Sequence, residues 1–434
     1  MQASPIYQHV KHALEHFFKH QQYNFTVALS GGVDSVVLLH VMHLLKQAQP
    51  KLNVNAIYVN HGLSQYANDW QRFCLNLCAE LNVPFNAAQV TINPQTRTSL
   101  EAQAREARYK ALDELSPAGS VILLGQHLND QIETFLLRLK RGSGLKGLGA
   151  MQKMRELQSG RICYRPLLNI TRSDIEHFAT EFNITHITDD SNTDERFDRN
   201  FLRARVVPLL AKRFKGFEHC AGRSIELLQQ QQALLDEYTE LDLKQSINAH
   251  QALSVSQLTT YSDVRITNVV RAWLSLFTQV MPSQKQLLQI INQAINAQAD
   301  AQMQVDLSEG QIRRHQEYLY FVTPHALLAD EALTSNELAL NDGRVLIKQQ
   351  GKGLRAPLPN EQVTVRFNCN SARIKPLKKP GSNTLKHWFK DAKVAPWLRE
   401  RVPLIFYNDE LVQVVGYFVS EKHQDENGIF WECK

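Results

Sequence analysis

The sequence predicts an α/β protein, with a doubly wound, mostly parallel sheet in its first half, then a helical domain and a small α+β domain. From Asn24 to Lys140, short apolar strands alternate with helices, which is typical of a parallel sheet covered on both faces. From Glu218 to Ala299 the chain is rich in Leu, Gln and Ala at helical spacing, with little strand signal. The length of 434 residues exceeds a typical single domain, so several domains are expected.

Each element of the predicted sheet follows from its local pattern. The strands are short runs of apolar and β-branched residues, and the helices carry apolar residues at intervals of three and four. Ligands bind beyond the carboxyl ends of such strands, so the segments that follow the strands are candidates for a site. In chain order the predicted strands are Asn24–Leu29, Val54–Val59, Ala87–Ile92 and Val121–Gly125, and the predicted helices are Val36–Leu45, Trp70–Leu81, Leu100–Leu115 and Asp130–Lys140.

The rest of the chain divides at two changes in composition. One lies near Lys215–Phe217, and Ala332–Asn341 is predicted to be a polar linker. The predicted domains are therefore residues 1–215, 216–331 and 342–434. No stretch approaches about 20 uninterrupted apolar residues and the first residues lack a signal-peptide pattern, so we expect a cytoplasmic protein without a membrane span. The oligomeric state stays open, with a homodimer as one arrangement.

The charged residues are unevenly distributed. The net charge is only +5, but Glu195–Arg223 holds eight Lys or Arg against three acids, and Arg366–Arg401 holds ten against two. Such clusters suit a polyanionic partner, because each neutralised phosphate releases counterions; solvated basic faces are the alternative. The six cysteines include no CxxC pair, which favours buried thiols over a metal or redox pair.

A candidate phosphate loop lies between the first strand and the first helix. Paired glycines let the backbone approach a ligand closely, and N–H groups at a helix start point towards negative charge. Two serine hydroxyls can donate to phosphate oxygens, and an aspartate beside an anion makes sense if it holds Mg²⁺. No Walker motif is present, and a glycine turn without a ligand is the alternative. The loop consists of Ser30, Gly31, Gly32, Val33, Asp34 and Ser35.

This SGGxDS loop is similar to the signature of the PP-loop ATP pyrophosphatases. The resemblance implies a fold like that of the adenine nucleotide alpha hydrolases. It also implies cleavage of ATP between the α and β phosphates, with AMP transferred to a substrate oxygen. Such a loop would hold the departing diphosphate while a metal spreads the developing charge.

Further motifs narrow the resemblance to one family. Their order and spacing along the chain are similar to those of tRNA(Ile)-lysidine synthetase, a bacterial enzyme, from the first domain to the last. The motifs are Val59–Ser64, the helix residues Glu101, Ala102, Ala104, Arg105, Arg108 and Tyr109, then Gly125–Thr134, Arg165–Leu168, Asp190–Asn192, Arg199–Arg203 and, near the end, Trp388, Asp391 and Val394–Leu404.

The resemblance implies a reaction in two steps. ATP adenylates the 2-carbonyl oxygen of the cytosine at the first anticodon position of an isoleucine tRNA. The ε-amino group of free L-lysine then attacks that carbon and releases AMP. The lysidine base formed pairs with A rather than G, so the tRNA reads AUA. ATP and Mg²⁺ are the implied cofactors, and the target base must be unstacked to reach ATP.

Two acids and two histidines are candidates for the reaction. Asp130 and Glu133 lie three apart on one helical face, so both carboxylates could meet one cationic amine. The family motif makes them the lysine-binding pair, and Glu133 is also a candidate to assist deprotonation. His61 and His127 are assigned to the nucleotide. The alternatives are an acidic helix start and a packed histidine.

Basic residues supply the remaining candidates. Arg105 and Arg108 lie three apart and could reach phosphate from one face, and Arg108 is assigned to ATP. A second arginine group is assigned to AMP phosphate or the tRNA backbone, with Arg203 as a catalytic residue; salt-bridged helix faces are the alternative. In the last domain, three lysines beside two tryptophans are assigned to tRNA docking. These residues are Arg199, Arg203 and Arg205, then Lys378, Lys379 and Lys390.

The chain departs from the family pattern at two positions. In the expected HHxDDQxET motif, Gln126 replaces the first His and Asn129 replaces the first Asp. Asn129 removes a negative charge, which weakens its case as a metal or lysine ligand. Asp130 keeps its place in the motif.

Three other functions compete with this interpretation. A tRNA 2-thiolation enzyme would share the loop but needs a catalytic cysteine or an Fe–S cluster, and Cys163 is the only cysteine near the later motifs. An amidotransferase-type synthetase needs an ammonia source, and no N-terminal nucleophilic cysteine is present. A non-catalytic RNA-binding protein with a degenerate loop is disfavoured by the intact Asp34, Asp130 and Glu133.

Overall fold

The computed structural model describes most of the chain, and two compact units divide it. The described residues are 1–62, 64, 66–90, 100–188, 194–296, 303–325 and 328–434. The first unit spans residues 1–237 and the second spans 238–434, and each is considered by itself. Among the described residues, none of the helices is both long enough and apolar enough to cross a membrane.

The first unit is built on a six-stranded sheet, as the alternation of strands and helices predicts. Five neighbouring strands are parallel and one edge strand is antiparallel, so the sheet is mostly parallel. The strand order is β3 (Phe85–Gln89), β2 (Asn53–Asn60), β1 (Asn24–Ala28), β4 (Val121–Leu123), β6 (Ile162–Tyr164) and β5 (Met154–Glu156).

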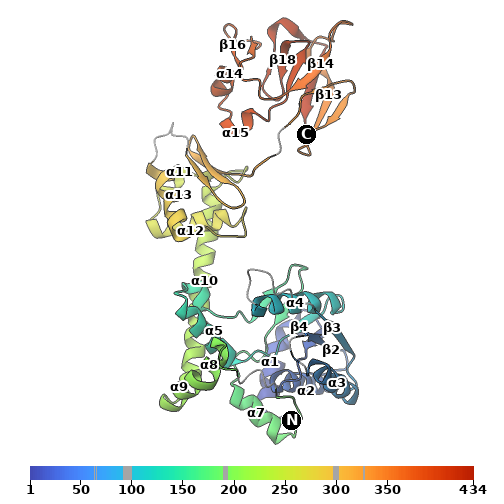
Figure 1. The fold of residues 1–434 in the computed structure, drawn as a ribbon, viewed down its shortest axis with the longest axis vertical. Coiled ribbons are helices and arrows are strands. Elements are labelled where there is room, and N and C mark those ends of the chain that lie inside the picture. The colour runs from blue at the N-terminus through green and yellow to red at the C-terminus, as the bar shows by residue number, and fades with distance from the viewer. Residues whose placement is uncertain (63, 65, 91–99, 189–193, 297–302, 326–327) are drawn as a thin grey trace. The chain divides into compact units, whose positions relative to one another are not determined.

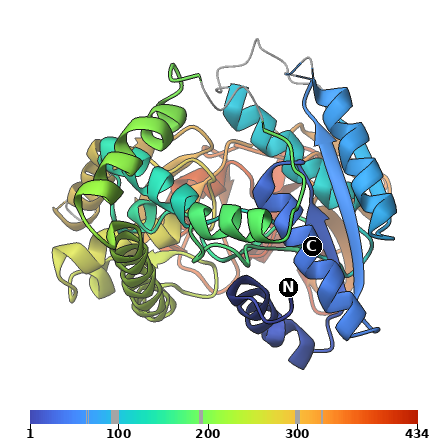
Figure 2. The same cartoon turned by 90° about the horizontal axis from the view of Figure 1, so that it is seen from below.

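Helices cover both faces of this sheet because strand residues alternate between the faces. On one face, residues such as Val54 and Val121 pack in a large apolar core with helices from several parts of the chain (Figure 2). On the other face, Ile57 and Ile122 pack against Leu112 of α4 (Leu100–Leu115). The helices of the first face are α1 (Pro5–Lys19), α2 (Val33–Ala48), α3 (Ala67–Glu80) and α7 (Arg172–Glu181).

Several predicted boundaries differ from the structure by one to three residues, among them those of the third strand and of the first helix after the phosphate loop. The third strand starts at Phe85, two residues before the prediction, and residues 91 and 92 lie outside the described part. Helix α2 starts at Val33 rather than near Val36, because Gly32 takes the extended backbone conformation of an N-cap residue. Asp34 therefore belongs to the first helical turn, where backbone N–H groups lack partners within the helix.

A second group of helices completes the first unit. Ile132 of α5 and Val207 of α9 form a small apolar cluster with Phe217 of α10. Between α8 and α9 the chain makes a π-helical turn, an irregularity often found at functional sites. The elements are α5 (Leu128–Lys140), α6 (Leu145–Leu148), α8 (Asp198–Phe201), the π-helical turn Leu202–Val206, α9 (Val207–Arg213) and α10 (Phe217–Ser246).

The first part of the second unit has its own core around the buried Trp273. Helices α11, α12 and α13 agree with the predicted helical character. The same part also contains a four-stranded antiparallel sheet, which the Leu- and Gln-rich pattern does not reveal. The elements are β7 (Leu253–Ser254), α11 (Val255–Leu258), α12 (Asp263–Leu274), α13 (Gln284–Asn296), β8 (Gln304–Asp306), β9 (Gln311–His315) and β10 (Tyr318–Val322).

The last part of the chain is α+β, as predicted, and Figure 1 shows its strands with helices α14 and α15. Its sheets have the orders β11-β14-β17-β18-β19 and β12-β13-β20, with β21 also paired to β13 and β15 paired to β16. The elements are β11 (Glu331–Ala332), β12 (Glu337–Ala339), β13 (Val345–Leu354), β14 (Val363–Arg366), β15 (Arg373–Ile374), β16 (Asn383–Thr384), α14 (Leu385–Asp391), α15 (Pro396–Arg399), β17 (Leu404–Tyr407), β18 (Glu410–Val414), β19 (Phe418–Val419), β20 (Gln424–Asp425) and β21 (Ile429–Cys433).

The segment predicted as a linker, 332–341, is not a free connection. Ala332 pairs with Thr364, and Glu337–Ala339 pairs with Val345–Ile347. Short polar segments of this kind look like linkers in the sequence, because edge strands are often short and charged.

The central strand β1 gives a test of the sheet. Phe25 is fully buried, and its ring lies edge-on to Phe17 and Phe18. We expect Phe25→Ala to lower the free energy of unfolding of the first unit by about 3–5 kcal/mol, because it leaves a cavity in the core. Leu75→Ala on α3 is the control, since Leu75 is 49% exposed. This substitution should change the free energy of unfolding by less than about 0.5 kcal/mol. Calorimetric unfolding of the full chain measures both; equal effects would contradict this packing.

Candidate active site at the carboxyl edge of the parallel sheet

The six predicted loop residues, Ser30–Ser35, form a tight turn from β1 into α2. Gly31 has a φ of +88°, and a Cβ there would lie 2.5 Å from Ile187 Cδ1. The backbone just after β4 also lies close to the loop, because a Cβ on Gly125 would lie 3.0 Å from the backbone nitrogen of Ser35. Only glycine satisfies both the left-handed conformation and the close contact at position 31.

The two loop serines hold this turn in shape. Ser35 Oγ accepts from the backbone N–H of Ser30 at 3.1 Å and donates to Gly32 O at 3.0 Å. The hydroxyls of Ser30 and Ser35 are 3.0 Å apart. The N–H groups of the first turn of α2 then face an anion with the favourable end of the helix dipole. The loop therefore has the form of a phosphate cradle.

Asp34 lies at this helix start with one oxygen engaged and one free. Its Oδ2 accepts from Arg172 Nη1 at 2.9 Å. Its Oδ1 is buried, has no hydrogen-bond partner among the described residues and lies 3.6 Å from His127 Nε2. Burial raises the pKa of Asp34, although His127 and Arg172 oppose the rise.

This free oxygen fits a magnesium ion held partly by a nucleotide. Magnesium in phosphate sites is typically bound by one or two carboxylates together with phosphate oxygens and water. No group of three or more His, Cys, Asp or Glu that could hold a metal occurs among the described residues. Asp34 is therefore a candidate to share a cation with phosphates rather than part of a metal site made only of protein ligands.

Helix α5 presents Asp130 and Glu133 on one face, as their spacing predicts. Both are buried, with exposures of 9% and 1%. Asp130 Oδ2 accepts from the backbone N–H of His127 at 3.1 Å, which caps the helix. His127 Nε2 lies 3.5 Å from the same oxygen, so this histidine stands between Asp34 and Asp130.

Two arginines neutralise this carboxylate pair. Arg199 donates to Asp130 Oδ1 at 3.1 Å and to Glu133 Oε2 at 2.7 Å. Arg203 donates to Asp130 Oδ1 at 3.0 Å and to Glu133 Oε1 at 2.7 Å. Burial alone would raise the pKa of Asp130, but His127 and both arginines lower it below its ordinary value. The sequence assigns these arginines to phosphate or catalysis, whereas the structure places them on the carboxylates.

Arg205 does not join this group. It pairs with Glu195 at 2.7 Å, and its side chain is 67% exposed. Arg199 and Arg203 lie four residues apart and share a face, but Arg205 is only two residues from Arg203 and points elsewhere. The three arginines that the sequence groups together thus form one half-buried pair and one separate surface residue.

His61 and Arg108 each carry a buried nitrogen that lacks a partner within the described part of the chain. These atoms are His61 Nδ1, just after β2, and Arg108 Nε on α4. Burial lowers the pKa of His61, and the positive charge of Arg108 lowers it further. Burial also lowers the pKa of Arg108, although Tyr109 opposes that. Buried polar atoms without partners are costly, so both residues suit a polar ligand, and the Arg108 guanidinium suits an anionic one.

The two departures from the family pattern have structural roles. Gln126 accepts a hydrogen bond from Nε of Arg165, a side chain only 2% exposed that also donates to Tyr109 Oη at 3.0 Å. Asn129 Oδ1 accepts from the backbone N–H of Arg172 at 2.9 Å. Neither residue points a charge at the site.

The comparisons with known proteins agree with this geometry. Three family models match the chain: "PP-loop domain" at residues 6–210, "TilS substrate binding domain" at 253–320 and "TilS substrate C-terminal domain" at 363–431. A tRNA(Ile)-lysidine synthase of Proteus mirabilis is 39% identical over 91% of this chain and 91% of its own length. That of Photobacterium profundum is 40% identical over 94% of this chain and 95% of its own length. The chain belongs to the tRNA(Ile)-lysidine synthase family.

Membership of the tRNA(Ile)-lysidine synthase family confirms the predicted PP-loop fold and ATP-dependent ligase class. The motif residues 190–192 lie outside the described part of the structure, as does Leu63 of the motif after β2. The other predicted site residues, which are the loop residues, the two histidines and the two carboxylates of α5, lie in the segments that follow β1, β2 and β4. The sequence missed Arg172, whose contact with Asp34 joins positions 138 residues apart.

The three buried cysteines are poorly suited to act as the nucleophile that a thiolation enzyme needs. Cys163 lies on β6 and is fully buried. Burial raises the pKa of its thiol to about 11, so it stays protonated at neutral pH. Burial also raises the pKa values of Cys74 and Cys78 to about 12.

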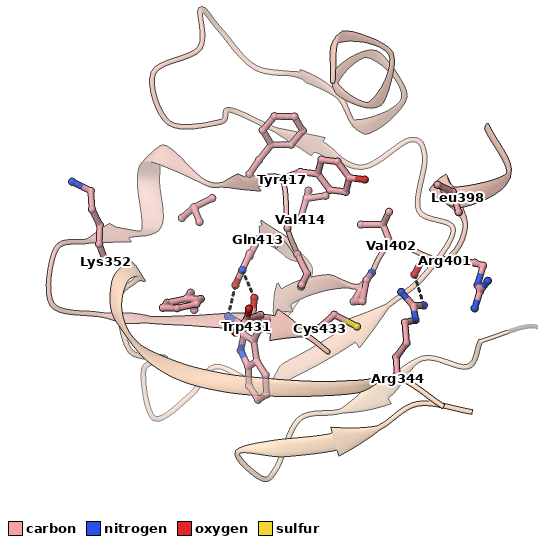
Figure 3. Close-up of a pocket in the computed structure, with 17 residues that line it drawn as sticks. Arg344, Lys352, Leu398, Arg401, Val402, Gln413, Val414, Tyr417, Trp431 and Cys433 are labelled. Atoms are coloured by element: carbon pink, nitrogen blue, oxygen red, sulfur yellow. Dashed lines mark hydrogen bonds between the residues drawn. The ribbon is translucent and has the colours of Figure 1, made fainter. Parts of the chain in front are cut away.

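The predicted docking lysines lie on the surface of the last part of the chain. Lys378, Lys379 and Lys390 are all exposed, and Lys379 pairs with Asp391 at 2.8 Å. An open pocket of about 780 Å³ lies in the same part, and none of these lysines lines it (Figure 3). Arg344 and Arg401 at its side both bind the carboxylate of Asp342.

Gly31 gives a test of the phosphate loop. We expect Gly31→Ala to weaken ATP binding at least about ten-fold, because a strained left-handed residue and a clash with Ile187 would both distort the loop. The matched control is Gly142→Ala, since Gly142 also has a positive φ of +65° but a Cβ there would meet nothing within 4 Å. Calorimetric titration with ATP measures both. Equal losses would show that backbone strain, not the contact with Ile187, matters.

Proposed function

We propose that this protein joins free L-lysine to the cytidine at the first anticodon position of an isoleucine tRNA. In the first step, the 2-carbonyl oxygen of cytosine attacks the α-phosphorus of ATP and diphosphate leaves. In the second step, the ε-amine of lysine attacks C2, the bond from C2 to the AMP oxygen breaks, and the amine loses a proton. The reaction consumes ATP and lysine and gives lysidine, AMP and diphosphate. Since tRNA and ATP are cytoplasmic, we place the protein there.

One observation carries this proposal. The phosphate loop and the buried carboxylate pair meet at His127, whose Nε2 lies 3.6 Å from Asp34 and 3.5 Å from Asp130. An ATP held by the loop would therefore bring its α-phosphate to the helix that carries Asp130 and Glu133. That juxtaposition suits a reaction in which an oxygen of the base first receives AMP and an amine then displaces that oxygen from the neighbouring carbon.

The loop residues and Asp34 would bind the phosphates of ATP, with Mg²⁺ shared by the free oxygen of Asp34. The ion would spread the negative charge that develops on the departing diphosphate. His61 and Arg108 offer buried donors without described partners to the same nucleotide. Arg199 and Arg203 would hold both carboxylates in place until the lysine ammonium arrives, and they favour the ionised form of Asp130.

The three matched family models support the proposed domain division. The matched ranges 6–210, 253–320 and 363–431 fall one within each of the proposed domains 1–215, 216–331 and 342–434. We propose that the second and third domains contact tRNA, as the descriptions of their family models suggest.

The deciding experiment measures the product. Purified protein is incubated with unmodified isoleucine tRNA, ATP, Mg²⁺ and labelled lysine, and the anticodon fragment is analysed by mass. We expect the mass gain of one lysine less one water on the first anticodon nucleotide, with one diphosphate and one AMP released for each lysine. Turnover without lysine but with a sulfur donor would support the thiolation alternative instead.

Asp34 and Asp130 should separate the two steps. We expect Asp34→Ala to abolish the adenylated tRNA intermediate, because the carboxylate at the loop is lost. We expect Asp130→Ala to retain adenylation but block lysine transfer, because the amine loses its carboxylate. Trapping of the intermediate on labelled ATP measures the first step, and lysine incorporation measures the second. An unchanged KM for lysine in Asp130→Ala would exclude lysine binding by Asp130.

The exposed lysines of the last domain provide a test of tRNA binding. We expect the triple change of Lys378, Lys379 and Lys390 to Gln to weaken tRNA binding and to flatten its dependence on salt, because fewer counterions are released. Filter binding at several salt concentrations measures this. The control is Lys110→Gln on α4, whose ion pair with Glu114 is exposed. An unaltered salt slope would contradict the docking assignment.

A further inference from the structure

Arg172 is joined to the phosphate loop although no motif marks it. It is the first residue of α7, and its Nη1 donates to Asp34 Oδ2 at 2.9 Å. Its Nε donates to Glu176 Oε1 at 2.7 Å, which fixes the plane of the guanidinium group. The side chain is 37% exposed, so it is neither fully buried nor free on the surface.

The backbone of α7 is held close to the loop on both sides. The N–H of Ile187, which follows α7, donates to Gly31 O at 2.9 Å. At the other end, the N–H of Leu128 donates to Ile170 O at 2.9 Å, so the start of α5 is tied to the start of α7. Arg172 thus projects from a fixed backbone next to the phosphate loop.

Asn129 binds an N–H group that the capping box of α7 leaves open. Helix α7 already has a complete capping box, because Thr171 Oγ1 accepts from the N–H of Asp174 and the Asp174 carboxylate accepts from the N–H of Thr171. Asn129 Oδ1 accepts from the N–H of Arg172 at 2.9 Å. Its Nδ2 donates to Glu218 Oε1 of α10 at 2.5 Å, so one amide fixes Arg172 against two other helices.

We propose that Arg172 is a further binding residue for the diphosphate end of ATP, and that Asn129 positions it. This inference rests on the proposed function, in which the loop holds the diphosphate that leaves. Without nucleotide, the guanidinium group is the counter-ion of Asp34. When a metal ion takes the carboxylate, the same group is within reach of the phosphates beside Asp34, and its planar fork suits two phosphate oxygens.

The chemistry explains why an asparagine serves at position 129. An aspartate there could also accept from the N–H of Arg172, but it would place a second carboxylate against Glu218. The neutral amide accepts on one side and donates on the other, so it satisfies both neighbours. Asn129, in place of the expected Asp, therefore holds the start of α7 without adding a negative charge near the diphosphate.

Binding of three ligands tests the role of Arg172. Calorimetric titration of the full chain uses pyrophosphate, ATP and AMP, each with Mg²⁺. We expect Arg172→Ala to weaken pyrophosphate and ATP about ten- to one hundred-fold, because a charge-assisted contact is lost, and to leave AMP unchanged. The matched control is Arg72→Ala, which also removes an arginine–aspartate contact of 2.8 Å, but on the exposed face of α3.

The outcomes separate this inference from the proposed function. If the unaltered protein binds neither ATP nor pyrophosphate, the proposed function fails. If the unaltered protein binds both and Arg172→Ala binds them equally well, only the role of Arg172 fails. An equal loss for AMP would show a general disturbance of the loop and would overturn the assignment to the diphosphate.

A double-mutant cycle tests the positioning role of Asn129. We expect Asn129→Leu, which is similar in volume but has no acceptor, to weaken pyrophosphate binding about ten-fold and to have no further effect in the Arg172→Ala protein. The paired change Asn129→Asp with Glu218→Gln restores an acceptor and a neutral partner, so it should recover most of the affinity. Additive losses in the cycle, or no recovery in the paired change, would exclude positioning by Asn129.

Discussion

The site depends on a buried pairing of two carboxylates with two guanidinium groups. Asp130 and Glu133 come from α5, whereas Arg199 and Arg203 come from α8 and the π-helical turn that follows it. Removing the partner of a buried carboxylate or of a part-buried guanidinium group is costly, so the ion pairs favour keeping the four groups together. This requirement fixes the distance between two elements that lie about 70 residues apart in the chain.

That pairing also fixes what lies next to it. Because α5 is held by the arginines, its N-cap residue His127 is held too, and His127 reaches Asp34 at the phosphate loop. Asn129, one turn from the same helix start, holds Arg172 on the other side of Asp34. The phosphate loop, the carboxylate pair and α7 are therefore parts of one connected polar network, in which Arg172 is the member that sequence motifs do not mark.

The sequence revealed features that depend on local pattern, and it missed features that depend on contacts between distant segments. Alternating strands and helices predicted the parallel sheet, and the glycines predicted where the chain turns tightly from β1 into α2. The spacing of Asp130 and Glu133 predicted their common face. It could not show that Arg199 and Arg203 would occupy those carboxylates, or that Arg205 would not, because a π-helical turn changes the direction of side chains. The sequence also did not show that Glu337–Ala339, in the predicted linker, forms a strand. That strand can be identified only from its pairing with β13.

The balance of charge explains why some donors lack partners. Three carboxylates, Asp34, Asp130 and Glu133, face three guanidinium groups that contact them directly. Arg172 also binds Glu176, so the network has no excess of positive charge, and a polyphosphate would bring negative charge that it does not compensate. His61 and Arg108 stand outside these pairs, and each has a buried nitrogen that finds no acceptor in the described part of the chain. Arg108 adds positive potential that the paired arginines cannot supply, and the nucleotide is the partner that we propose for both residues.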